Sequence, residues 1–220
     1  MQADLMTIDY YTDILCVWAW IAQARVDELN TQLGEGIRLR YHYVDVFGDT
    51  AAKMHSQWAE RGLYEGFARH VAESAAGFEK APVNPLIWTR TRPATSANAH
   101  MVLKALELSL GQQASIDMAL ELRKAFFVEA ADIGSMTVLR SMIRQNGYDE
   151  KAVERSLENG SAIAALMGDY QQANKIGIKG SPSYVMDGGR QTLYGNVGYR
   201  VLRANVEELL KQPSDEASWC

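Results

Sequence analysis

The sequence predicts an α/β fold in which a βαβ unit and a ββα unit are separated by a long all-helical insertion. Strand patterns occur near the two ends of the chain, whereas residues 49–177 show helical segments with recognisable caps. The 220 residues contain no internal repeat and no low-complexity linker. One α/β domain split by an insertion therefore fits this order better than two tandem domains.

The first unit is a strand, a helix and a second strand. Residues 5–11 are rich in Ile, Tyr and Thr, which favours a strand, and a helical stretch follows at residues 18–33. Gly34 and Gly36 end this helix, and residues 37–46 alternate between apolar and polar side chains as a half-buried strand does. Two strands joined by a helix predict a parallel pair.

Helix starts and stops divide the insertion. Three prolines around Trp88 indicate an irregular connection there rather than a helix interior. The predicted helices are residues 96–110, which follow Thr95, and the runs that begin after Ser135, after Asp149 and at Ser161.

The second unit is a hairpin followed by a helix. Residues 183–186 and 191–194 flank an Asp-Gly-Gly turn, and the last helix covers residues 198–211. We expect residues 213–220, which end in Cys220, to be a flexible tail. The expected domains are residues 1–48 with 178–212 for the α/β part, and residues 49–177 for the insertion.

Composition excludes several classes of function. The 27 acidic and 22 basic residues give a net charge of −5, so nucleic acid is not an expected partner. The chain lacks a secretory leader pattern and any apolar run of the ~18 residues that cross a membrane, which predicts a cytoplasmic protein without a membrane partner. Neither a metal nor a permanently bound cofactor is expected, because the 2 cysteines and 4 histidines have no metal-binding spacing. The oligomeric state is not indicated.

Cys16 lies where the first strand passes into its helix. Unpaired backbone N–H groups and the helix dipole at such a junction favour a thiolate, so we expect a thiol pKa below the ~8.5 of a free cysteine. The alternative interpretation is a buried, unreactive cysteine that acts as a small apolar residue.

Pro182 precedes the first strand of the hairpin, in the segment Gly180-Ser181-Pro182-Ser183. A proline here cannot donate to the strand ladder and is suited to a tight, cis turn. The alternative is an ordinary proline at the start of a strand.

Together these segments resemble the DsbA-like thioredoxin family, particularly its FrnE-like and 2-hydroxychromene-2-carboxylate isomerase-like branch. Residues 13–21, DILCVWAWI, are similar to the D-x-x-C-P-W-C-Y-I segment of that branch, and residues 180–183 are similar to its G-V-P-T loop. Residues 126–133 resemble the F-F-x-E-x-x-D-I of its helical insertion, and residues 193–202 its last strand and helix.

The resemblance implies a thioredoxin fold with Cys16 as the nucleophile opposite the Pro182 loop. Ala19 occupies the position of the second cysteine of dithiol members, so a mixed disulfide at Cys16 would need an external thiol such as glutathione to resolve it. Trp18, Ser181 and Pro182 are then the expected contacts for glutathione or an extended disulfide substrate.

Three hypotheses follow for function. The first is a thiol–disulfide oxidoreductase that acts through Cys16 and uses glutathione as co-substrate; Cys220 is a conceivable internal resolving thiol, with an exposed terminal thiol as the alternative. The second is a glutathione-dependent isomerase or transferase, although kappa-class and isomerase relatives carry serine where this chain has Cys16. The third is a thioredoxin-like binding module without catalysis.

Overall fold

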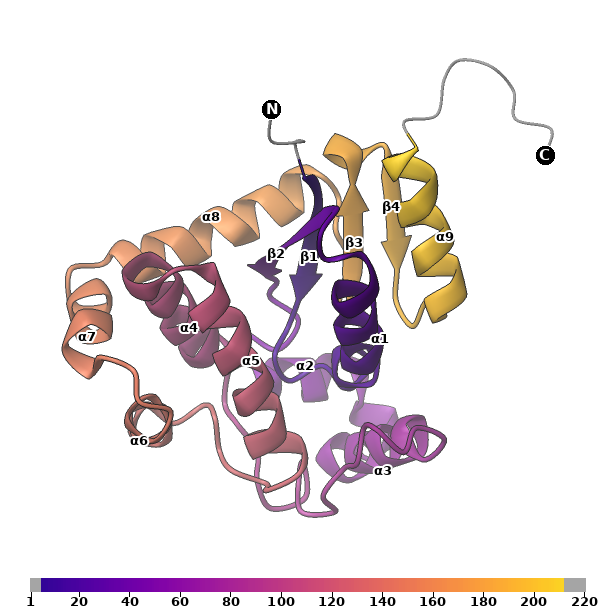
Figure 1. The fold of residues 1–220 in the computed structure, drawn as a ribbon. Coiled ribbons are helices and arrows are strands. Elements are labelled where there is room, and N and C mark those ends of the chain that lie inside the picture. Colours follow the sequence, from indigo (N-terminus) through magenta and orange to yellow (C-terminus); the bar gives the residue numbers. More distant parts are fainter. Residues whose placement is uncertain (1–4, 212–220) are drawn as a thin grey trace.

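The central sheet has four strands in the order β2-β1-β3-β4. Its strands are β1 (Met6–Thr12), β2 (Ile37–Tyr43), β3 (Ser183–Met186) and β4 (Gln191–Tyr194). β1 and β2 run parallel, whereas β3 is antiparallel to both β1 and β4. Figure 1 shows the computed structural model, which describes residues 5–211.

The predicted βαβ unit is confirmed, with α1 (Val17–Leu33) connecting the parallel strands. β2 is shorter than predicted, however, because it ends at Tyr43 instead of continuing to Val46. The amides of Val46 and Phe47 donate to the carboxylate of Asp13, so they leave the strand ladder and bend toward the end of β1.

The ββα unit is also confirmed. The hairpin between β3 and β4 turns through Asp187, Gly188 and Gly189, whose φ angles of 50°, 62° and 99° all lie in the left-handed region. Glycine tolerates this conformation because it has no Cβ, which explains the two glycines of the turn. The last helix, α9 (Tyr199–Leu210), follows β4.

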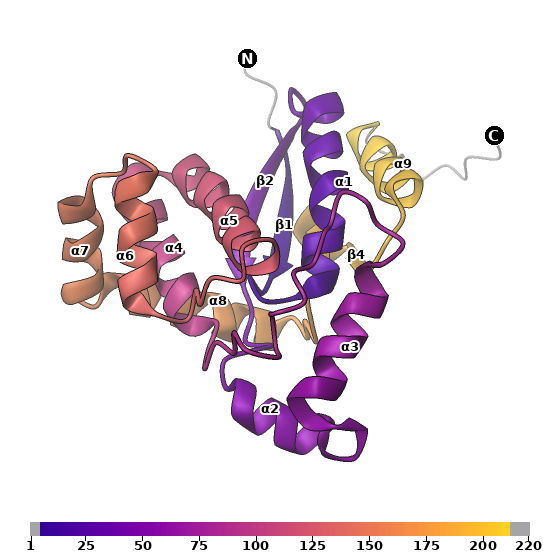
Figure 2. The same cartoon turned by 90° about the horizontal axis from the view of Figure 1, so that it is seen from below.

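Seven α-helices lie between β2 and β3 among the described residues. They are α2 (Thr50–Gln57), α3 (Leu63–Ala75), α4 (Ala97–Leu110), α5 (Gln112–Phe127), α6 (Met136–Gln145), α7 (Glu150–Glu158) and α8 (Ser161–Lys175). Asp149 caps α7 and α8 begins at Ser161, both as predicted. In Figure 2, α2 and α3 project from the rest of the fold on one side, and α6 and α7 on another.

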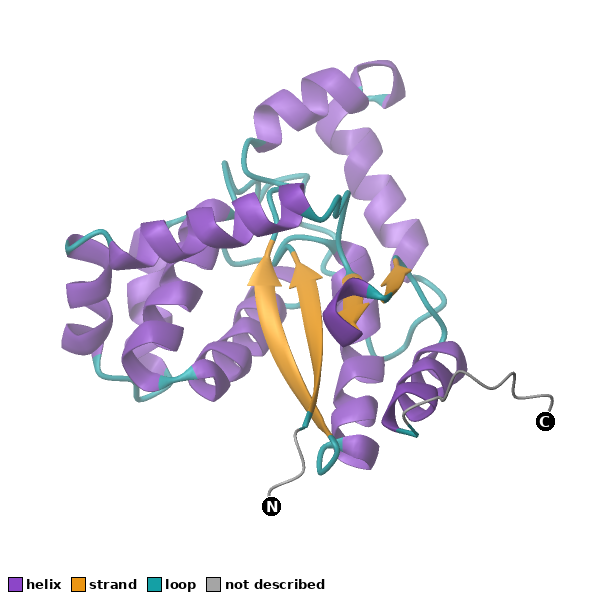
Figure 3. Ribbon diagram, turned by 90° about the horizontal axis from the view of Figure 1, so that it is seen from above, coloured by secondary structure: helices purple, strands orange, loops and turns teal. Residues whose placement is uncertain are grey.

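Helices cover both faces of the sheet. α1 and α9 pack on one face, where Val26 and Val206 join a cluster with Ile8 and Tyr184 from the strands. α8 lies on the other face, where Ala173 packs with strand residues. Figure 3 shows β1 and β2 running side by side with helices around them.

The beginning of α1 shares its core with the insertion. Cys16, Ala19 and Trp20 belong to the same buried cluster as Val102 of α4 and Phe126 of α5. The Cys16 loop is therefore enclosed by the sheet unit and the inserted helices together. None of the helices within residues 5–211 combines the length and apolar composition needed to cross a membrane.

Candidate active site

Cys16 is the N-cap residue of α1, directly after the loop that leaves β1. Its backbone is extended, with φ −79° and ψ 118°, and its side chain forms no capping bond to the helix. The Cys16 amide donates to the Asp13 carbonyl at 3.1 Å, and its own carbonyl receives the Trp20 amide at 3.0 Å. The sulfur thus lies beside the first turn of the helix.

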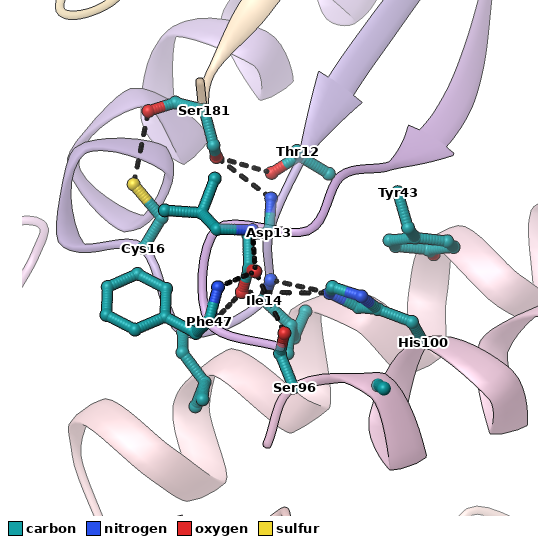
Figure 4. Close-up of polar contacts among 12 residues, drawn as sticks. Thr12, Asp13, Ile14, Cys16, Tyr43, Phe47, Ser96, His100 and Ser181 are labelled. Atoms are coloured by element: carbon teal, nitrogen blue, oxygen red, sulfur yellow. Dashed lines mark hydrogen bonds and ion pairs between the residues drawn. The ribbon is translucent and has the colours of Figure 1, made fainter. Parts of the chain in front are cut away.

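The loop before Cys16 is anchored by the buried carboxylate of Asp13. One oxygen accepts the Leu15 amide at 2.9 Å, and the other accepts the amides of Val46 at 3.1 Å and Phe47 at 2.9 Å. The Ser96 hydroxyl donates to the second oxygen at 2.8 Å. Figure 4 shows Asp13 with Phe47 and Ser96 among these partners. Every partner donates, so the Asp13 side chain joins its own loop to two distant segments, at residues 46–47 and at Ser96.

His100 supports the same loop from α4. Its Nε2 accepts the Ile14 amide at 3.1 Å, so the ring proton lies on Nδ1, which is 3.3 Å from the Tyr170 hydroxyl. The ring is fully buried and stacks on Tyr43, and burial lowers its pKa even though the charge of Asp13 raises it. His100 is therefore a neutral histidine of the core that holds the loop through its Nε2.

The Ser181–Pro182 segment closes the site from the opposite side. The peptide bond between these residues is cis. The Ser181 hydroxyl accepts the Asp13 amide at 2.9 Å, and the Pro182 carbonyl accepts the Gly195 amide at 2.8 Å. The Cys16 thiol donates to the Ser181 carbonyl, with 3.2 Å between sulfur and oxygen.

The resting state of Cys16 is a thiol, not a thiolate. Burial raises its pKa, and the charge of Asp13 acts in the same direction. The amides of Ala19 and Trp18 at the helix start and the Ser181 hydroxyl have a smaller, opposite effect and lower the pKa without compensating for burial. The expectation of a lowered pKa is therefore wrong for this structure: the helix end is present as predicted, but the residue is only 6 % exposed.

Residues 7–207 match the family model of the DSBA-like thioredoxin domain. The chain belongs to this family. The DSBA-like fold is also found in a putative protein disulfide isomerase from Nitrosomonas europaea, with 14 % identity, a TM-score of 0.79 and coverage of 96 % of this chain and 100 % of that one. A comparison with curated protein sequences found no match.

Two further DSBA-like structures have described activities. The cytosolic disulfide reductase DsbM from Pseudomonas aeruginosa is 19 % identical, with a TM-score of 0.68 and coverage of 94 % of this chain and 100 % of that one. A 2-hydroxychromene-2-carboxylate isomerase is 17 % identical, with a TM-score of 0.65 and coverage of 97 % and 100 %. At these identities the likeness shows the fold alone, and the family includes both oxidoreductases and an isomerase.

Most of the predicted site residues meet in this DSBA-like chain. Cys16, Ser181 and Pro182 lie together, and Ala19 lies in the first turn of α1 that Cys16 caps. Trp18 is half-buried and packs on the core cluster around Cys16. Cys220 lies outside the described residues. Within residues 5–211 no group of three His, Cys, Asp or Glu side chains could hold a metal ion.

Lys53 of α2 is a candidate site residue that the sequence analysis missed. Its Nζ lies 5.0 Å from the centre of the Phe47 ring, which Figure 4 shows beside Cys16, and 3.0 Å from Gln57 Oε1. Burial lowers the Lys53 pKa, while the charges of Asp13 and Cys16 raise it. The Lys53 charge would therefore favour a Cys16 thiolate over the resting thiol. No motif marks it, because only the folded loop before α2 brings it near the thiol.

Proposed function

We propose that this chain is a thiol–disulfide oxidoreductase that reacts through Cys16 alone and depends on glutathione or another external thiol. The observation that carries the proposal is the 3.2 Å contact between the Cys16 sulfur and the carbonyl of Ser181, beside Pro182. It brings the single thiol of the motif to the loop where the family resemblance expects a disulfide substrate. Ala19 leaves no second thiol in the motif.

The reaction has two exchange steps. The Cys16 thiolate attacks one sulfur of a disulfide, a new S–S bond forms at Cys16, and the other sulfur leaves as a thiolate. An external thiolate then attacks the mixed disulfide and regenerates Cys16. When the substrate joins a protein thiol to glutathione, the protein thiol is released first, and the two glutathione molecules leave as their disulfide.

Deprotonation of Cys16 limits the first step. The resting thiol donates to a carbonyl, and burial raises its pKa, so only a small fraction is ionised at neutral pH. The Ala19 amide and the Lys53 ammonium favour the thiolate once the proton leaves. A cytoplasmic setting, where reduced glutathione is abundant, suits this single-thiol chemistry.

Intact-mass spectrometry after exposure to glutathione disulfide tests the proposal. The Cys220→Ser variant should gain one glutathione, which a reducing thiol removes, because Cys16 remains available. In the matched Cys16→Ser variant, no glutathione should add at position 16. No adduct on Cys220→Ser, or an adduct that requires Cys220, would overturn the proposal.

A glutathione-dependent isomerase or transferase is the second candidate. The observation that favours it is the protonated Cys16, because a thiol that donates a hydrogen bond can serve a bound glutathione thiolate as a serine hydroxyl would. In that case Cys16→Ser should keep glutathione binding and turnover of an electrophile, while Cys16→Ala loses turnover. Absence of glutathione binding by calorimetry would remove this candidate.

A further inference from the structure

The loop before Cys16 is compatible with only one tautomer of His100. The Ile14 amide donates to His100 Nε2 at 3.1 Å, and a backbone N–H can only donate. Nε2 therefore carries no proton, and the single proton of the neutral ring lies on Nδ1. Figure 4 shows the His100 ring beside Ile14 in this loop.

The nearest charge works against this tautomer. Asp13 Oδ1 lies 3.7 Å from His100 Nε2, and both side chains are completely buried. A buried carboxylate attracts a proton to the nitrogen that faces it. A proton on Nε2 would meet the Ile14 amide as a second donor, so the hydrogen bond from Ile14 would be lost. The observed tautomer therefore needs a partner that holds the proton on Nδ1.

Tyr170 of α8 is that partner. Its hydroxyl oxygen lies 3.3 Å from His100 Nδ1, and it accepts because Nδ1 bears the proton. The preceding residue, Asp169, fixes α8 here, since it accepts the Tyr43 amide at 3.0 Å and lies 3.2 Å from Lys104 Nζ. The Tyr43 ring also stacks on His100, with 4.8 Å between the ring centres. β2 and α8 thus hold both the ring and its acceptor.

We propose that Tyr170 is a positioning residue for Cys16, because it fixes the His100 tautomer that accepts the Ile14 amide. This role rests on the proposed function, since the alignment of the loop matters for catalysis only if Cys16 is the reacting group. Removing the Tyr170 hydroxyl should let the proton move to Nε2 and release the Ile14 amide. Cys16 would then be less well aligned with the Ser181 carbonyl.

The position of the proton can be measured directly. The nitrogen-15 chemical shifts of the His100 ring show which nitrogen is protonated, and at pH 8 the lowered pKa of His100 keeps the ring neutral. Tyr170→Phe keeps the aromatic ring and removes only the hydroxyl. It should move the Nε2 signal toward that of a protonated nitrogen. Hydrogen exchange of the Ile14 amide should become about threefold to tenfold faster, because one hydrogen bond is lost.

The effect on Cys16 is measured as the rate of glutathione addition from glutathione disulfide, in a Cys220→Ser background. Tyr170→Phe should slow this addition about threefold to tenfold, because attack on a disulfide requires alignment. Alkylation by iodoacetamide, a small reagent without this requirement, should not slow. His100→Gln offers an oxygen to the Ile14 amide and has no tautomers. In that background Tyr170→Phe should change neither the glutathione rate nor the amide exchange, since both side chains act through one contact.

Tyr148→Phe is the matched control. The Tyr148 hydroxyl also makes an internal hydrogen bond, to the Ala114 carbonyl at 3.2 Å, but it lies in the connection between α6 and α7. It should leave the His100 signals and the glutathione rate unchanged. An unchanged Nε2 signal in a folded Tyr170→Phe variant, or equal slowing of glutathione addition and alkylation, would overturn the role of Tyr170. If glutathione adds to Cys16 in no variant, the proposed function falls, whereas the ring signals still show where the His100 proton lies.

Discussion

Asp13 shows how a single side chain can define a reactive loop. Its carboxylate is completely buried, yet it receives hydrogen bonds from Leu15, from the segment after β2 and from Ser96 at the start of α4. These bonds replace the water lost on burial, so the charge is tolerated. The position of Cys16 is therefore fixed by a network that also fixes the loop carrying Phe47 beside it.

Lys53 leads to a prediction about anionic disulfides. Lys53→Met should slow the reaction of Cys16 with glutathione disulfide by about threefold to tenfold at low ionic strength. The reason is that the positive charge of Lys53 attracts the anionic disulfide and stabilises the Cys16 thiolate. The reaction with the neutral hydroxyethyl disulfide should slow less. The measurement is the rate of mass increase with each disulfide in a Cys220→Ser background.

The exposed residue Lys151 of α7 provides the control for Lys53. Lys151→Met removes the same charge far from Cys16 and should leave both rates unchanged. Equal slowing with the anionic and the neutral disulfide in Lys53→Met would contradict an electrostatic role in substrate attraction.

The sequence identified some of these residues and not others for physical reasons. Cys16 and Ser181 could be paired from the sequence through the family resemblance, because local patterns place each only at the start of an element. The raised pKa of Cys16 could not be predicted, since a helix end is visible in sequence but burial by distant helices is not. Asp13 belonged to the quoted motif, whereas its partners Ser96 and Phe47 become neighbours only in the folded chain.

At the scale of elements, His42 connects β1, β2 and α8. Its Nε2 lies 2.9 Å from Asp9 of β1 and its Nδ1 lies 3.0 Å from Asp169 of α8. Both ring nitrogens face carboxylates, an arrangement that favours the protonated ring. Burial lowers the His42 pKa, but the hydrogen bonds to Asp169 and Asp9 outweigh it and raise the pKa overall.

This arrangement predicts a pH-dependent contribution to stability. The pKa of His42 is higher in the folded than in the unfolded protein, so protonation of His42 stabilises the fold. This stabilisation is fully present below the unfolded pKa of ~6.5 and is lost as pH rises through the folded pKa. His42→Gln should therefore lower the free energy of unfolding by about 2 kcal/mol at pH 6 and by less at pH 9, measured by urea denaturation.

Other titrating groups do not obscure this comparison. Bonds to His42 and Arg40 lower the pKa of Asp9 to about 2 despite burial, so its contribution is lost only as pH falls toward that value. His100, whose pKa is lowered, destabilises the protein as pH falls below ~6.5, but equally in both variants. His55→Gln, at an exposed position of α2, is the matched control. An equal loss at pH 6 and pH 9 in His42→Gln would contradict the prediction.

Element types were easier to predict than element ends. The alternation of β2 indicated its two faces correctly, and Tyr41 and Tyr43 are buried while Arg38 and Arg40 are exposed. The predicted end of β2 was wrong because the Asp13 side chain, from another segment, accepts hydrogen bonds from the amides that would have continued the strand. No local sequence pattern indicates that a distant side chain will compete with the strand ladder for these amides.

At the scale of the whole molecule, the helical insertion and the start of α1 share one buried cluster. Trp20 of α1 stacks on Phe127 of α5 at 5.7 Å, and Trp88, from the irregular connection, meets Phe126 edge-on at 5.4 Å. The insertion therefore does not pack as a separate core beside the sheet unit. We expect the two parts to unfold together.

Cooperative unfolding can be measured with two probes. Tryptophan fluorescence reports on this shared cluster and far-ultraviolet circular dichroism on the helices, and their urea transitions should coincide. Phe126→Leu should move both transitions to lower urea together, with a loss of about 1–3 kcal/mol. Val201→Ala, at an exposed position of α9, should move neither. Separate transitions would show that the insertion unfolds on its own.

The order of elements gave the overall topology because βαβ and ββα units have few ways to combine into one sheet. What it did not indicate was the degree of enclosure around Cys16. That enclosure arises from α2, α4 and α5, whose packing directions depend on side chains far apart in the sequence.

The contact between Cys16 and Ser181 has a consequence for synthesis of the chain. The two residues are 165 positions apart, so the carbonyl that receives the thiol proton is made long after the cysteine has left the ribosome. During that interval the nascent chain carries Cys16 without the carbonyl that accepts its hydrogen bond. The site around the thiol is therefore completed only after the Ser181 segment and β3 have been synthesised.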